Sequence, residues 1–352
     1  MKLYFLFIFS RFFMKKLSDV LTVRSTMFAT ISVLVLLAAL LAMGLLTPFI
    51  LRVSTEEEIL LDAAYFNLRA ALPTLALVML LTLCLLIGSA GKKEALLVFG
   101  LGISGSALSV AFSPFSSLPV NISFPLLSAA LFAVIYRLLS SKEKTLKGTL
   151  RRAGSHIIHL GAVLLLVGIV FSTNMNLEDS AVVPLGEVGT FKSMGYSVRV
   201  TNITSGIEGT PYGGYSGSAY VSTVYFDVYR WGQLFDRGQV RYISDFKWEQ
   251  AYTETYIHRG LLEELFIAPK SVDTKSQTVE LYVRKVPFMT ALWGGFYLMV
   301  LGVLMIFLSD SLKGEKGTPG DGLPGNRFYE RNSQVNESKN DNRKKRVSKK
   351  NV

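Results

Sequence analysis

The chain has 352 residues, of which 50% are hydrophobic and 18% charged, and its mean hydropathy is +0.37. This composition is too apolar for a soluble globular protein and indicates an integral membrane protein. The net charge is +11, and the single cysteine, Cys84, excludes an internal disulfide or a CxxC pair, and with them thiol–disulfide chemistry by this chain alone.

Residues 1–26 are predicted to form an N-terminal cytoplasmic segment. The extreme N-terminus, MKLYFLFIFSRFF, is apolar but short and lacks a small-residue cleavage site. The sequence MKKLSDV, which begins at Met14, has the character of a natural start. Residues 1–13 are therefore interpreted as a translation-start extension or an interfacial segment.

Apolar runs long enough to cross a bilayer follow in order, since a spanning helix needs roughly 20 mostly apolar residues. We predict about six transmembrane helices: five in a transmembrane region over 27–173 and a last helix over 287–309. The individual runs are 27–52, 70–90, 94–112, 123–141, 155–173 and 288–309.

The polar segment 174–286, between the fifth and sixth helices, is predicted to be a β-rich extracytoplasmic domain. Val, Tyr and Phe alternate with polar residues over 220–231, 233–240 and 278–286, which is typical of strands, and 211–218 is a Gly/Ser/Tyr loop. A short helix is expected over 253–265 (TETYIHRGLLEEL), with Thr253 as its cap.

The charges predict the orientation. Lys and Arg gather before the first helix, after the second and before the fifth, whereas the intervening loops are acidic or uncharged. The positive-inside rule then places both termini in the cytoplasm and 174–286 outside. The tail 310–352, which is basic and contains RKKRVSKK, is interpreted as a disordered cytoplasmic segment beside a membrane rather than a nucleic-acid-binding one.

Two of the three histidines, His156 and His159, lie at the start of the fifth apolar run, GSHIIHLGAVLLLVGIVFS (154–172). Three residues apart on a helix, they occupy adjoining parts of one face. Gly154, Gly161 and Gly168 recur every seven residues on roughly the opposite side, where small residues let another helix approach closely. Ionisable groups within spans usually mark a functional site.

The chemistry of these histidines has several readings. A zinc site is disfavoured because His258 is the only other histidine and no ligand set has the required spacing, and a proton relay would need carboxylates within the spans. A haem iron needs only an axial imidazole and an apolar slot. The alternative is a histidine at the membrane interface that is hydrogen-bonded to a neighbour. We favour it for His156, near Arg151, whereas for His159 both readings stay open.

Several segments resemble CcmF, the membrane haem-ligation subunit of cytochrome c maturation system I. The span HIIHLGAVLLLVGIVFS resembles the HLG-containing span of CcmF, and softer matches elsewhere in the chain fall in the family's order. These are TPF (47–49), AYFN (64–67) with Pro73, RYISDFKWEQAYTETYIHRGLLEELFIAP (241–269) and VELYVRKVPFMTALWGGFYLMVLG (279–302).

The resemblance covers only the second half of a CcmF chain and implies a split protein. The family's tryptophan-rich haem-handling loop is absent, so a partner chain would supply that half. The resemblance implies that His159 is an axial ligand of the iron of an intramembrane haem b. His156 matches no family ligand and is interpreted as a neighbour of that site, and His258 as a surface histidine.

The implied activity is that of a haem lyase (holocytochrome c synthase) subunit, with no catalytic residue assigned in this chain. The haem b would pass electrons to a second haem, which a chaperone delivers outside and which is then joined to the CxxCH thiols of apocytochrome c. Implied partners are the tryptophan-rich CcmF half, the haem chaperone, apocytochrome c with its thiol-handling factors, and the membrane, but no nucleic acid. Two alternatives are a transporter or channel component, hinted at by Gly100, Gly102 and Gly105, and a structural anchor for the β domain.

Overall fold

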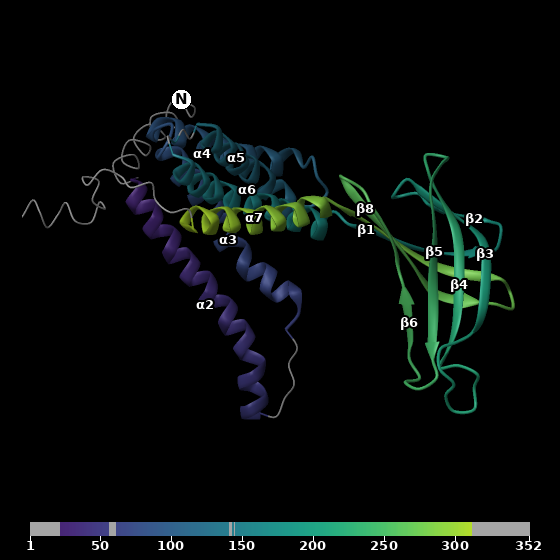
Figure 1. Ribbon diagram of the computed structural model, residues 1–352. Coiled ribbons are helices and arrows are strands. Elements are labelled where there is room, and N and C mark those ends of the chain that lie inside the picture. The colour runs from purple at the N-terminus through teal and green to yellow at the C-terminus, as the bar shows by residue number, and fades with distance from the viewer. Residues whose placement is uncertain (1–21, 56–60, 141–142, 144, 312–352) are drawn as a thin grey trace, which may run out of the picture.

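A computed structural model describes residues 22–55, 61–140, 143 and 145–311. Within these ranges, six helices are long and apolar enough to cross a membrane. The first five lie before the β-rich segment and the sixth after it, as predicted (Figure 1). Their bounds are α2 Val23–Thr55, α3 Ala63–Ile87, α4 Lys92–Phe112, α5 Leu118–Ser140, α6 Leu146–Asn174 and α7 Met289–Ser311.

Local signals explain where two of the helices begin. The Asp62 carboxylate accepts a hydrogen bond from the backbone N–H of Tyr65 at 2.9 Å, and the Thr145 hydroxyl accepts one from that of Gly148 at 3.1 Å. Such side-chain caps satisfy the free N–H groups at a helix start. Both helices therefore start earlier than the apolar runs alone predicted.

Helices α3 to α6 form a packed bundle, and α7 lies along α6 (Figure 1). The buried cluster inside the bundle draws on α3, α4, α5 and α6. Its buried members are Val78, Leu83, Leu85, Leu86, Ala95, Leu126, Leu127, Ala130, Ala133, Val134 and Val163. Helix α2 runs obliquely along the outside beside α3 and buries few of its side chains.

The β-rich region consists of two antiparallel sheets beyond the end of the bundle where α6 stops and α7 starts (Figure 1). One sheet has the order β1-β9-β8-β7 and the other β2-β3-β4-β5-β6. The strands are β1 Leu177–Pro184, β2 Val188–Phe191, β3 Tyr196–Glu208, β4 Ala219–Arg230, β5 Gln233–Asp245, β6 Ala251–Glu254, β7 Tyr256–Arg259, β8 Glu263–Asp273 and β9 Thr278–Pro287.

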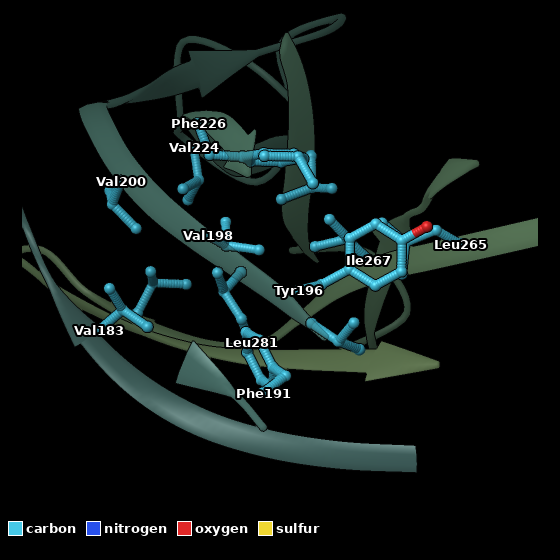
Figure 2. Packing of buried hydrophobic residues seen from close by; sticks show 14 of the residues in the cluster. Val183, Phe191, Tyr196, Val198, Val200, Val224, Phe226, Leu265, Ile267 and Leu281 are labelled. Atoms are coloured by element: carbon cyan, nitrogen blue, oxygen red, sulfur yellow. The ribbon is translucent and has the colours of Figure 1, made fainter. Parts of the chain in front are cut away.

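The core of this module lies between the two sheets. Alternate residues of the strands turn inward, as the period of two requires. Val198 and Phe226 come from one sheet and Ile267 and Leu281 from the other, and each is at most 1% exposed. Figure 2 shows these side chains gathered in one apolar interior, to which Tyr196 also belongs.

The expected helix over 253–265 is wrong, because this stretch holds the end of β6, all of β7 and the start of β8. Gly260 lies in the turn between β7 and β8, and its N–H donates to the carbonyl of Glu263 at 3.0 Å. Leu265 and Ile267 then alternate into the core. Tertiary pairing and burial override the helical propensity of the LLEEL sequence.

Two sequence-based predictions lie outside the described residues. These are the interpretation of residues 1–13 and the disordered tail over 312–352.

Candidate functional site

The two histidines of α6 lie in the first half of a 29-residue helix. They are about 60° apart around its axis, as three residues of an α-helix require. Val163, one heptad after His156, is 1% exposed and belongs to the buried cluster of the bundle. This face of α6 is therefore turned toward the other helices.

His156 is the more buried histidine, with 7% of its surface exposed. Neither Nδ1 nor Nε2 has a hydrogen-bond partner among the described residues. This differs from the expected interface histidine hydrogen-bonded to a neighbour, because the nearby Arg137 and Arg152 form no hydrogen bond with the ring. A buried polar group without a partner costs about 1–3 kcal/mol, which is a reason to look for a ligand nearby.

His159 is half-buried, on the edge of the same face. The nearby Leu166 and Val170 are only partly buried and pack against the bundle cluster. The helix that carries His159 is therefore packed in the bundle, while part of the surface of the His159 side chain stays exposed. An additional helix or a flat apolar ligand could reach it from that side.

The opposite side of α6 packs on α7 through glycines from both helices, as the heptad spacing predicted. A Cβ placed on Gly161 would lie 2.5 Å from the carbonyl oxygen of Gly295, and one on Gly154 would lie 2.7 Å from that of Gly302. Such close backbone approach is what small residues at helix interfaces permit. The packing with α7 fixes the rotation of α6 and so the direction of its histidine face.

A group of basic residues lies at the end of the bundle away from the β module. Arg151 and Arg152 are in the second turn of α6, which is about 43 Å long, and the β module follows its other end. At the basic end, Arg137 Nη1 of α5 donates to the carbonyl of Gly88 at 3.0 Å, in the turn between α3 and α4. The cationic residues of these connections thus share one end of the bundle.

His258 lies in the β module and is remote in the fold from the α6 pair. Its Nδ1 is 2.7 Å from Asp236 Oδ2, its side chain is 30% exposed, and its ring lies against Phe235. The Tyr256 hydroxyl donates to the same oxygen. This hydrogen bond, together with the one from His258, holds the pKa of Asp236 below its usual value despite partial burial. The residue predicted as a surface histidine is half-buried in a local polar cluster.

The described residues contain no group of three or more His, Cys, Asp or Glu side chains placed to hold a metal ion. The donors of the candidate site are two imidazoles on a helix that packs against the apolar cluster of the bundle, with Arg137 and Arg152 near His156. A haem supplies four equatorial nitrogens itself and requires only axial imidazoles and an apolar slot. The unpartnered nitrogens of His156 and the half-open His159 thus suit a haem better than a bare metal ion.

Comparisons with known proteins bear on the fold. No family model matches the sequence, and no curated protein matches it. A solved structure named "Cytochrome c Heme Lyase CcmF" is similar with a TM-score of 0.62 and 16% sequence identity, over 81% of this chain and 46% of that one. The chain therefore spans about half the length of that protein, and it has a CcmF-like membrane fold.

Proposed function

We propose that the chain is a membrane subunit of a cytochrome c maturation system, equivalent to the C-terminal half of a CcmF protein. The observation that carries the proposal is the imidazole pair on the face of α6 that packs into the bundle, within a CcmF-like fold. A helix of a purely structural anchor has no need of His156, whose two ring nitrogens are buried without partners.

In this proposal His159 is the axial ligand of an intramembrane haem b. Its half-open position would leave room for a second imidazole, from the tryptophan-rich partner chain, to help hold the same haem. A haem with two imidazole ligands carries single electrons. His156, deeper in the bundle, lies beside this site, and the apolar face of α6 excludes water from it.

The same proposal includes the orientation and the partners. The basic connections lie at the end away from the β module, which supports a cytoplasmic basic end and an outer β module. There the module would face the haem chaperone and apocytochrome c. The tryptophan-rich half would pack on the open side of the bundle.

The test is to co-express the chain with the proposed partner, purify the complex and record a reduced spectrum. We expect a b-type haem signal that survives purification and is lost in His159→Ala, because one axial ligand is removed. In His156→Ala we expect haem to remain, with a shifted midpoint potential. Wild-type complex without haem would contradict the proposal, and haem retained in His159→Ala would reassign the ligand.

A further inference from the structure

A groove lies where the turn between β7 and β8 meets the first turns of α7. It consists of two adjoining cavities of about 540 and 520 Å³, which share Leu261, Thr290 and Tyr297. The Thr290 hydroxyl donates to the carbonyl of Gly260 at 2.8 Å and so ties the turn to the helix. The β7–β8 turn and the start of α7, which form the two sides of the groove, are therefore joined by a hydrogen bond.

One half of the groove is apolar and runs along the bundle. Leu164 of α6 and Leu298 and Leu301 of α7 line it. Gly294 also lines it, and a Cβ added there would meet no atom within 4 Å. This half has the shape and lining that a hydrocarbon chain requires.

The other half of the groove carries two opposite charges. Glu264 lines it although only 5% of its surface is exposed, and its carboxylate forms no hydrogen bond or ion pair with any described residue. Arg259 is paired directly with Glu264 across the β7–β8 ladder, also lines the cavity, and makes no ion pair with it. The Glu264 carboxylate therefore opens into the cavity, where none of the described residues pairs with it, and an ammonium group that enters the cavity would provide a partner.

Two aromatic residues complete this half. Trp293 and Tyr297 of α7 are stacked with their ring centroids 6.5 Å apart, and they are 48% and 64% exposed. Trp and Tyr at the first turns of a spanning helix mark the level of the lipid headgroups. Aromatic faces beside a carboxylate form a favourable environment for an ammonium group.

We propose that this groove binds one zwitterionic phospholipid of the ethanolamine type. Glu264 and the aromatic pair bind its ammonium, Arg259 binds its phosphate, and one acyl chain lies in the half lined by Leu298 and Leu301. Tyr297 lines both halves, so the charged half adjoins the apolar half as the headgroup of such a lipid adjoins its acyl chain. The proposal needs the membrane location of the chain but not the haem site.

The test is native mass spectrometry of the full chain, purified in detergent, delipidated and titrated with phosphatidylethanolamine or with phosphatidylglycerol of the same acyl chains. Both lipids carry a phosphate, but only the first carries an ammonium. We expect wild type to bind phosphatidylethanolamine at least tenfold more tightly. Glu264→Gln should abolish this preference, whereas Glu254→Gln, which changes an exposed carboxylate outside the groove, should keep it.

Further variants separate the lipid site from folding effects. Arg259→Gln should weaken binding of both lipids, and Gly294→Leu should block the apolar half without touching either charge. Circular dichroism and the melting temperature check that each variant folds. Equal affinity of wild type for the two lipids, a preference that persists in Glu264→Gln, or a protein partner that occupies the groove in place of lipid would overturn the proposal.

Discussion

At the scale of single residues, Glu263 is the polar centre of the inner end of the β module. Its carboxylate accepts a hydrogen bond from Tyr196 at 2.9 Å and pairs with Arg230 and Lys285, each at 2.7 Å. Burial alone would raise the pKa of Glu263, but these partners outweigh it and hold the pKa below its usual value. Burial and the same hydrogen bond raise the pKa of Tyr196 to about 12.

The depressed pKa of Glu263 predicts a dependence of stability on pH. The ionised carboxylate stabilises the module above its unfolded-state pKa, near 4.5, and this contribution is lost as the pH falls through the lower folded-state value. We expect Glu263→Gln to lower the free energy of unfolding by about 2 kcal/mol at pH 7 and to flatten the acid limb of stability. Thermal unfolding between pH 3 and pH 7 measures both effects.

The matched control for this prediction is Glu280→Gln, which removes a partly exposed carboxylate 3.7 Å from Lys270 on the same sheet. It should change stability by less than about 0.5 kcal/mol. A Glu263→Gln variant with unaltered stability at pH 7 would show that the hydrogen bonds and ion pairs of Glu263 only offset its desolvation.

The histidines illustrate what could be predicted at this scale. Their position on one face of a spanning helix follows from spacing alone, because an α-helix fixes the angle between residues. Their burial does not, since it depends on which neighbours cover each ring. His159 lies about one turn further from the start of α6, yet His156 is the more buried of the two because its side of the helix packs into the bundle.

At the scale of elements, the glycine contact between α6 and α7 predicts a sharp sensitivity to size. Gly161→Ala places a Cβ 2.5 Å from a backbone oxygen and 2.8 Å from the backbone nitrogen of Met299, so the helices must separate. We expect a loss of about 1–3 kcal/mol. The control is Gly100→Ala in α4, where a Cβ meets no atom within 4 Å, and melting temperatures in one detergent compare the two.

A Gly161→Ala protein as stable as wild type would contradict the close approach of the two helices.

The sequence of α4 contains three glycines that suggested a broken helix of a transporter, and two of them have a packing role instead. Gly102 and Gly105 lie against α5, where Cβ atoms would come within 3.3 Å of Leu126 and 3.1 Å of Pro125, and α4 is continuous through all of them.

The stretch over 253–265 shows why part of the molecule could not be predicted. Read as a helix, it would place Arg259 and Glu264 about 140° apart, on different sides. In the observed hairpin they are direct cross-strand neighbours that line one groove. Long apolar helices and alternating strands such as 220–231 are recognisable because their periodicity extends over many residues, whereas short strands depend on partners distant in the chain.

At the scale of the whole molecule, the separation of the basic end from the β module predicts the topology. After Cys84→Ala, a cysteine in place of Thr274, in the turn between β8 and β9, should react with an impermeant maleimide in intact cells. One in place of Ser140, at the end of α5, should react only after permeabilisation if the basic end faces the cytoplasm, as we propose. Labelling of Ser140→Cys from outside would reverse the orientation.

The junction between the two parts of the protein has a mechanical consequence. Only Met175 and Asn176 separate α6 from β1, only Phe288 separates β9 from α7, and β1 pairs with β9 along its full length. The paired strands thus continue the paired helices α6 and α7 through connections of only two residues and one residue. We expect a rotation of this strand pair to be transmitted to α6 and so to change the direction of the His159 imidazole.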